Sequence, residues 1–324
     1  MKVLYGYRDL DEKLEDPIVA IGVFDGIHIG HKRVIKKVLN SRERGRDRAV
    51  VTFDPHPQTV LHPGKTPSRI MSLEHRLFIF EKMGLDATIV IRFTDFIAMM
   101  PPEEFVRRVL RGIGARKVYV GDNFHFGRGK SGNIETFIQI GKDCGIDVRT
   151  VRPVTEKGKV VSSTWLRKLI MAGDIKKAQQ LLSRPVSVLG TVVTGERRGG
   201  AFGVPTANID PHHEVIPPPG VYAAKVDIDG KLFNGVLNIG FKPTFYGKRL
   251  KRRKEPHIEV HVIGFKGDLY GKSIEIFFVK RLRRERKFKS VDMLKSQIAR
   301  DVVRAKKVLT AKDIVLKIKR YKGI

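Results

Sequence analysis

Residues 18–35 constrain the fold of this chain more than any other stretch. They begin with the apolar run Ile18–Phe24, which is typical of a strand buried on both faces. The chain turns at Asp25-Gly26, and apolar residues then recur at helical spacing. A strand that enters a helix through a glycine turn leaves free backbone N–H groups beyond the strand end, and such groups bind phosphate. The apolar stripe of the predicted helix consists of Ile27, Val34, Ile35, Val38 and Leu39.

Two histidines, His28 and His31, stand at the start of this predicted helix. A spacing of three residues puts them on one helical face. A structural alternative is a pair that caps the helix or packs beneath a loop. The position favours phosphate chemistry, because ligands of open parallel sheets bind at the carboxyl ends of the strands.

Strands and helices alternate through the rest of the first half. This alternation predicts a parallel sheet with helices on both faces. The expected strands are residues 48–53, 87–93, 117–120 and 146–151, and the expected helices are 72–83, one beginning at 101, 133–144, 162–171 and 175–182.

Beyond Ser183-Arg-Pro185 the pattern changes, and strands follow one another with few helices. Asp229-Gly230 is a strong signal for a two-residue hairpin turn. Short strands with regular turns predict an antiparallel barrel or sandwich, which a helix over 291–309 closes. We therefore expect a first domain over 1–182, a second over 183–309, and a tail, 310–324, of unassigned structure. The expected strands are 188–194, 221–228, 232–239, 256–263 and 273–279.

Length and composition fit two domains of ordinary size. The 324 residues are 41% hydrophobic, and no apolar run approaches the ~20 residues of a membrane span. The N-terminus lacks the apolar segment of a secretory signal. A single cysteine, Cys144, excludes an intrachain disulfide and a cysteine-cluster metal site. These features predict a cytoplasmic protein with no membrane partner.

The charge is strongly positive, with 63 Lys and Arg against 34 Asp and Glu, a formal +29. Such an excess is compatible with nucleic-acid binding, with anionic substrates, or with the charged surface of heat-adapted proteins. The basic residues cluster at 248–254 and 280–289. Neither run has the repeated aromatic residues of a single-strand binding surface. Nucleic acid is therefore a possible partner that the sequence does not favour, and the oligomeric state stays open.

Three further loops of the first half carry candidate ligand contacts. Thr52–Pro57 holds His56 between two prolines, which restrict the backbone. Gly121–Asn133 is rich in glycine, although its match to a dinucleotide fingerprint does not stand in the first strand–helix turn. Val161–Arg167 places hydroxyls at a helix start, where they cap the helix and also suit a triphosphate.

Together with Gly22–His31, these motifs resemble the FMN adenylyltransferase module of the bacterial bifunctional riboflavin kinase/FAD synthetase family, over residues 19–172. The resemblance implies a Rossmann-like nucleotidyltransferase fold. Asn123 stands where the family usually has Asp. The implied catalytic residues are His28 and His31; the implied ATP and phosphate contacts are Gly22, Phe24, Asp25, Gly26, Ser163, Thr164 and Arg167; and the implied flavin contacts are His56, Asn123, Phe124 and Phe126.

The second half carries polar residues in an extended segment and on one predicted strand. Thr206 and Asn208 are two apart and face the same way in an extended segment, as do Glu259 and His261. Oxygens of the first pair suit Mg²⁺ with nucleotide phosphates, and a carboxylate such as Glu259 suits a general base. A turn stabilised by Thr and Asn, and a solvent-facing Glu, are the structural alternatives.

Motifs over 186–306 resemble the riboflavin kinase module of the same family, in the order in which that module carries them. The resemblance implies a riboflavin-kinase-like antiparallel barrel, with Thr206 and Asn208 as metal contacts and Glu259 as the base. It further implies nucleotide contacts at Gly195 and Gly203 and flavin contacts at Arg283 and Phe288. The matching segments are 205–208, 235–240 with 243–244, 259–261, 268–271 and 282–288.

The resemblance therefore implies a bifunctional enzyme of FAD biosynthesis. Its second domain phosphorylates riboflavin to FMN, and its first adenylates FMN to FAD with release of pyrophosphate. Riboflavin, FMN and ATP are the expected substrates, Mg²⁺ the expected metal, and no tightly bound prosthetic group is expected. Two alternatives stay open: an enzyme of the same fold with one activity, and a basic nucleic-acid-binding protein with vestigial sites.

Overall fold

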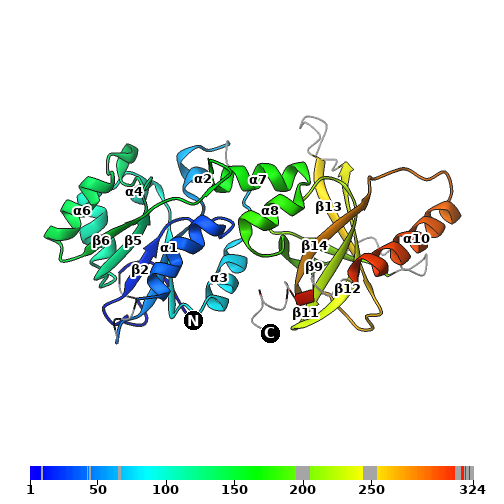
Figure 1. Ribbon diagram of the computed structural model, residues 1–324, viewed down its shortest axis with the longest axis horizontal. Coiled ribbons are helices and arrows are strands. Elements are labelled where there is room, and N and C mark those ends of the chain that lie inside the picture. Colours follow the sequence, from blue (N-terminus) through cyan, green and yellow to red (C-terminus); the bar gives the residue numbers. More distant parts are fainter. Residues whose placement is uncertain are drawn as a thin grey trace. The chain divides into compact units, whose positions relative to one another are not determined.

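The computed structural model describes residues 1–324 except 9, 42, 44, 65–66, 195–204, 244–253, 311–314, 317, 319–320 and 322–324. Predicted contacts Gly195 and Gly203 and the basic run 248–254, apart from Lys254, lie outside the described residues. The chain forms two compact units, Met1–Trp165 and Leu166–Ile324 (Figure 1).

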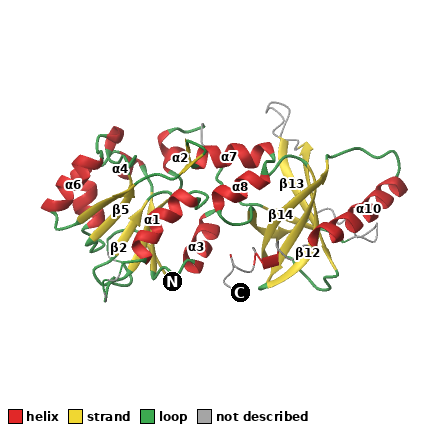
Figure 2. Ribbon diagram, in the orientation of Figure 1, coloured by secondary structure: helices red, strands yellow, loops and turns green. Residues whose placement is uncertain are grey.

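The first unit is built on a parallel sheet in the order β1-β4-β3-β2-β5-β6 (Figure 2). All four residues of β2 are buried, as the apolar run predicted. The order reverses between β2 and β5, so the loops that follow these neighbouring strands open a crevice at their carboxyl ends. The strands are β1 (Lys2–Tyr5), β2 (Ile18–Ile21), β3 (Arg48–Asp54), β4 (Ala87–Arg92), β5 (Lys117–Gly121) and β6 (Asp147–Val151).

Helices of the first unit begin at residues whose side chains cap them. Ser72 and Asn133 each accept a backbone N–H of the following turn, and buried apolar residues hold α1 and α6 against the sheet. The helices are α1 (Ile29–Leu39), α2 (Pro57–Leu61), α3 (Leu73–Lys82), α4 (Asp95–Ala98), α5 (Pro102–Glu104) with the π-helix η1 (Phe105–Leu110), the 3₁₀ turn η2 (Arg128–Lys130) and α6 (Ile134–Asp143). A hairpin of β7 (Thr155–Glu156) and β8 (Lys159–Val160) follows, and then α7 (Ser163–Ala172), which begins in the first unit and continues into the second.

One edge strand went unassigned in the sequence. Strand β1 pairs in parallel with β4, yet only Leu4 among its four residues is buried. Such a short segment gives no period-2 pattern that distinguishes a strand from a loop. The strand that leads to the histidines, β2, is therefore the second strand of the chain and a central strand of the sheet.

The second unit contains a closed antiparallel barrel in the order β10-β13-β12-β11-β14-β9. Helix α8 (Ile175–Leu182) precedes it, and α10 (Val291–Leu309) packs on β11, β12 and β14. The predicted fold class, a parallel sheet followed by an antiparallel barrel with a closing helix, is confirmed. The strands are β9 (Ser187–Val193), β10 (Ala207–Asp210), β11 (Gly220–Ile228), β12 (Lys231–Pro243), β13 (Lys254–Ile263) and β14 (Ser273–Arg283).

Two described residues of the C-terminal tail, Ile318 and Tyr321, also pack in this unit. Ile318 is fully buried, and the ring of Tyr321 lies edge-on against Phe277 with 5.9 Å between centroids. The Tyr321 hydroxyl donates a hydrogen bond to Glu275 Oε1 at 3.1 Å. Within the part of the chain that the structure describes, no helix has both the length and the apolar character to cross a membrane.

Candidate active sites

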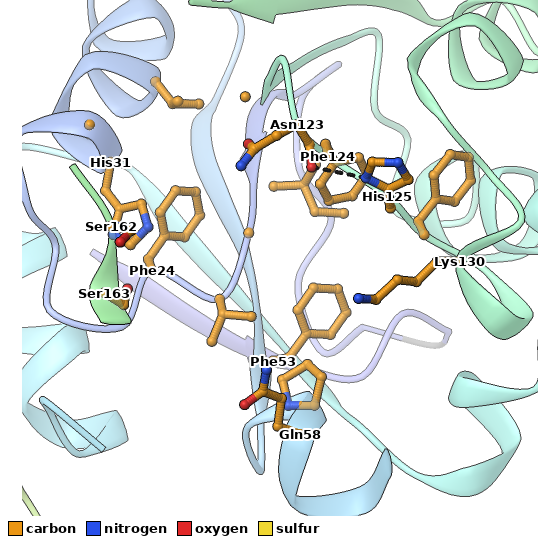
Figure 3. Close-up of a pocket in the computed structure, with 18 of the residues that line it drawn as sticks. Phe24, His31, Phe53, Gln58, Asn123, Phe124, His125, Lys130, Ser162 and Ser163 are labelled. Atoms are coloured by element: carbon orange, nitrogen blue, oxygen red, sulfur yellow. Dashed lines mark hydrogen bonds between the residues drawn. The ribbon is translucent and has the colours of Figure 1, made fainter. Parts of the chain in front are cut away.

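A cavity of about 810 Å³ opens at the carboxyl ends of the parallel strands (Figure 3). Its walls come from the loops after β2, β3, β4, β5 and β6, together with the start of α7. This is the location that the strand order predicts for a ligand. Of the predicted site residues, the cavity is lined by Gly22, Phe24, His28, His31, His56, Asn123, Phe124, Phe126 and Ser163.

His28 and His31 form a stacked pair at the start of α1. Their ring centroids lie 3.7 Å apart with 20° between planes, and His28 Nδ1 accepts the backbone N–H of His31 at 3.3 Å. Because Nδ1 is the acceptor, a neutral His28 ring carries its proton on Nε2. His31 Nδ1 is buried and has no hydrogen-bond partner among the described residues. The histidines thus cap the helix and line the cavity at once.

Burial makes both rings neutral at neutral pH. It lowers the pKa of His28 to about 4, and burial together with the neighbouring His28 lowers the pKa of His31 well below its usual value. A neutral imidazole offers one N–H donor and no net charge. The pair can therefore donate hydrogen bonds to a phosphate. The positive charge that balances the phosphate must come from other residues.

The turn between β2 and α1 is strained and held by buried contacts. Phe24 and Ile27 have left-handed φ values of 54° and 40°, which side chains other than glycine adopt at a cost. The buried carboxylate of Asp25 accepts the backbone N–H groups of Ile70 and Met71 at 2.9 and 3.1 Å. Asp25 therefore anchors the turn, and its side chain is not in the cavity wall.

Arg76 is a residue of this site that sequence reasoning missed. Its buried guanidinium, reaching from α3, donates to Val23 O at 2.8 Å and to Thr52 Oγ1 at 2.9 Å. It also pairs with Asp54 at 3.2 Å. One cation thus ties together the ends of β2 and β3, the strands that present His28 and His56. An arginine within an otherwise apolar helix face was the only signal in the sequence.

The start of α7 supplies hydroxyls on the histidine side of the cavity. Ser162 Oγ caps the helix by accepting the N–H of Trp165 at 3.3 Å, and Ser163 Oγ donates to Asp25 O at 2.8 Å. Thr164 is exposed and Arg167 is half-buried. Arg167 lies beyond Trp165, at which the first unit ends.

The opposite side of the cavity is aromatic. Phe124 and Phe126 stack with 5.7 Å between ring centroids. Phe53 stands below Phe124 in the view of Figure 3. The side chain of Asn123 is directed into the cavity beside Phe124 (Figure 3). His56 caps α2 by accepting the N–H of Gln58 at 3.1 Å. One flat apolar group and one phosphate group can therefore occupy the two sides of the same cavity.

The barrel of the second unit places polar residues in a row across three strands. Glu259 on β13 stands opposite Asn208 on β10 and opposite Asn238 on β12, so these three side chains share one face. Glu259 Oε1 lies 2.7 Å from His257 Nε2. Asn208 is 8% exposed, and its Oδ1 has no hydrogen-bond partner among the described residues. Thr206 directly precedes β10 and is half-buried.

Known proteins resemble both units. A FAD synthetase family model matches residues 10–165, and a riboflavin kinase model matches 182–309. A bifunctional riboflavin kinase/FMN adenylyltransferase of Bacillus subtilis is 35% identical over 92% of this chain and 94% of its own length. The chain belongs to this bifunctional family. The corresponding Escherichia coli K12 protein is 33% identical over 94% of this chain and 97% of its own.

The family's fold is also seen in a solved structure. A crystal structure of a Streptococcus pneumoniae protein, described as a macrolide-efflux protein, matches with a TM-score of 0.80 and 27% identity. The match covers 94% of this chain and 99% of that one. The resemblance predicted from the motifs is confirmed by these comparisons.

The basic segment that begins at the last residue of β14 is tied to the closing helix. Arg283 Nε donates to the buried Asp301 Oδ2 at 2.8 Å. The guanidinium groups of Arg283 and Arg286 lie 5.6 and 4.6 Å from the centre of the Phe288 ring. Arg283 therefore has a structural partner on α10, and Phe288 packs between cations.

Proposed function

We propose that the cavity of the first domain, residues 1–182, transfers the adenylyl group of ATP to FMN, and that the barrel domain, 183–309, phosphorylates riboflavin. Both activities are those of the family to which the enzyme belongs. The observation that carries the assignment of the cavity is the neutral His28–His31 pair at the start of α1, facing an aromatic wall.

Adenylyl transfer requires positioning more than a protein nucleophile. An FMN phosphate oxygen attacks the α-phosphorus of ATP; a new P–O bond forms, and the bond to pyrophosphate breaks. His28 Nε2–H donates to the phosphates as charge builds on their oxygens. N–H groups at the starts of α1 and α7, with Ser163, hold the triphosphate. The aromatic side, with Phe124, Phe126 and Asn123, takes the flavin ring.

Phosphorylation of riboflavin uses the polar row of the barrel. Glu259 accepts the proton of the terminal ribityl hydroxyl as that oxygen attacks the γ-phosphorus of ATP, and ADP leaves. His257, 2.7 Å from the carboxylate, positions it. Arg283 and Phe288 are the proposed flavin contacts, and Gly195 and Gly203 the proposed nucleotide contacts.

Mg²⁺ is the proposed metal of both reactions, bound with the ATP phosphates. The fit rests on the buried, unpartnered Oδ1 of Asn208 in the described structure, a neutral oxygen ligand beside Thr206. Among the described residues no group of three or more His, Cys, Asp or Glu could hold a metal alone. Bound there, the ion neutralises phosphate charge. We also propose a cytoplasmic location, because both reactions consume ATP.

A product assay tests this assignment. Wild type, His28→Ala and Glu259→Gln are incubated with ATP, Mg²⁺ and either riboflavin or FMN, and the flavins are separated by chromatography. We expect FMN and then FAD from wild type, FMN only from His28→Ala, and FAD from Glu259→Gln only when FMN is supplied. Each variant's retained activity shows that its unaltered unit is folded.

The remaining alternatives have distinct outcomes in this assay. FMN without FAD from wild type would indicate a single-activity enzyme and direct attention to Asn123, which Asn123→Asp would then test. No flavin product would refute the enzyme assignment and make salt-dependent nucleic-acid binding the next measurement.

A further inference from the structure

The glycine-rich loop after β5 forms a rigid hairpin at the cavity wall. Phe126 and Gly132 exchange two backbone hydrogen bonds, of 3.0 and 2.9 Å, and close the loop between them. Inside it, the N–H of Lys130 donates to Gly127 O at 3.0 Å. The N–H of Arg128 donates to Met100 O at 2.9 Å, which ties the loop to its surroundings. The loop is therefore held at its base and at its tip.

Close packing explains two of the glycines in this loop. A Cβ at Gly132 would lie 2.7 Å from the Phe126 ring, and one at Gly127 would lie 2.8 Å from Pro102. The backbone thus wraps tightly around an aromatic residue of the cavity. Lys130, which is not glycine, nevertheless has a left-handed φ of 61°. A non-glycine residue in this conformation costs free energy, and such strain concentrates at functional sites.

The side chain of Lys130 is directed into the cavity. In Figure 3 its ammonium group extends from the aromatic side, near Phe53, toward the side that carries His31 and Ser162. Arg128, two residues earlier in the same loop, is exposed like Lys130, but it does not line the cavity. Of the two cations of the hairpin, the one that lines the cavity is therefore Lys130.

Phosphates bound in the cavity need the positive charge of Lys130. Both histidines are neutral because they are buried, so they bring no positive charge to the phosphates. Among the described residues, the Lys and Arg side chains in the cavity wall are Lys130 and Arg152. Arg33 on α1 donates to the backbone oxygen of Arg152 at 3.4 Å, so Arg152 stands beside α1. Lys130 is the cation on the aromatic side.

We propose that Lys130 binds the phosphate of FMN and holds it between the aromatic side of the cavity and the starts of α1 and α7. This inference rests on the proposed adenylyl transfer. With the flavin ring on the aromatic side and the triphosphate on the histidine side, the FMN phosphate lies between them. That phosphate carries about −1.5 to −2 charge at neutral pH. Lys130 transfers no proton; it offsets repulsion between the attacking and the attacked phosphates.

The test distinguishes a contact with the phosphate of FMN from a contact with its flavin ring. Lys130→Gln removes the charge, Lys130→Arg keeps it, and Arg128→Gln removes a charge from the same loop outside the cavity. For each variant, the KM for FMN and for ATP in FAD formation is measured, with the inhibition constant of lumiflavin. Lumiflavin is the flavin ring without ribityl or phosphate, so the kinase cannot convert it.

We expect Lys130→Gln to raise the KM for FMN by about tenfold or more, as for loss of a hydrogen bond to a charged group. The inhibition constant of lumiflavin and the KM for ATP stay within about twofold. Lys130→Arg recovers most of the loss, and Arg128→Gln resembles wild type. The unchanged inhibition constant of lumiflavin and KM for ATP report that the first unit is folded, and riboflavin phosphorylation, unchanged in all variants, reports that the barrel unit is folded.

Other outcomes overturn the proposal. An equal rise for FMN and lumiflavin would place Lys130 at the flavin ring, and a rise for ATP alone would place it at the triphosphate. No change in any constant would remove Lys130 from the site. Failure of the proposed function is distinct, because wild type itself would then form no FAD.

Discussion

His28 caps helix α1 by accepting the backbone N–H of His31 on its Nδ1, and the two rings stack 3.7 Å apart. One contact therefore fixes both the helix start and the tautomer of the ring. The Nε2–H that remains is the group available to a phosphate. The same burial that aligns the rings also keeps them neutral.

Acid should destabilise the first unit through His28. Its pKa of about 4 in the folded chain lies below the ordinary 6.5, so the unfolded chain binds the proton more readily. The stability that a neutral His28 contributes is complete above pH 6.5 and is lost as the pH falls toward 4. Between pH 7 and 5 the loss amounts to about 2 kcal/mol.

His28→Asn keeps a capping oxygen and removes the titration. Between pH 7 and 5, wild type should lose about 2 kcal/mol more of its free energy of unfolding than His28→Asn loses. Urea unfolding followed by the fluorescence of Trp165, the single tryptophan, reports the first unit. Equal losses in the two proteins would contradict a buried neutral His28.

Asn208→Leu should lower kinase activity but leave the stability of the protein nearly unchanged. Because Asn208 Oδ1 has no hydrogen-bond partner among the described residues, an apolar side chain of similar size leaves the free energy of unfolding within about 1 kcal/mol of wild type. FMN formation from riboflavin should fall at least about a hundredfold, as expected for a lost metal ligand with its charge-assisted contacts. Asn208→Asp keeps an oxygen ligand and should retain more activity than Asn208→Leu. Unchanged kinase activity in Asn208→Leu would refute the metal role.

Arg76→Met should lower the stability of the first unit by about 3 kcal/mol, because removing a buried cation breaks several hydrogen bonds at once. Arg48→Met is the matched control. Arg48 pairs with Asp86 at 2.8 Å, but both side chains are more than a third exposed, so its loss should change stability by about 1 kcal/mol or less. Trp165 fluorescence during urea unfolding measures both variants. Equal losses would show that Arg76 does not clamp the strand ends.

Tyr321 should stabilise the barrel unit although it stands at the chain end. Tyr321→Ala removes a ring packed on Phe277 and a hydrogen bond to the buried Glu275, and should lower the free energy of unfolding by about 3 kcal/mol. Tyr321→Phe isolates the hydroxyl and should lower it by about 1 kcal/mol. Leu316→Ala, at a half-exposed residue, is the control. Calorimetry of the full chain resolves these losses; a null result for Tyr321→Ala would mean that the tail does not dock.

Much of this protein could be predicted from local pattern alone. The period of apolar residues separates the parallel sheet from the barrel, and the helix 291–309 begins and ends where its stripe does. Gly22–His31 and the order of the later motifs indicate the family. These signals are local, because the side-chain spacing of a strand or a helix is set within a few residues.

Tertiary structure decided which side chains face the ligand. Asp25 stands within the first motif, yet its carboxylate is bound by backbone groups 45 residues away. Arg76 lies in no motif and reaches its place through contacts with the ends of two strands. Lys130 lies in the glycine-rich loop but was not named as a contact, and the hairpin of that loop places it. A side chain's direction depends on what packs around it, and those neighbours come from distant parts of the chain. The sequence by itself therefore determined the fold class and the kind of site, whereas packing decided the role of each residue within it.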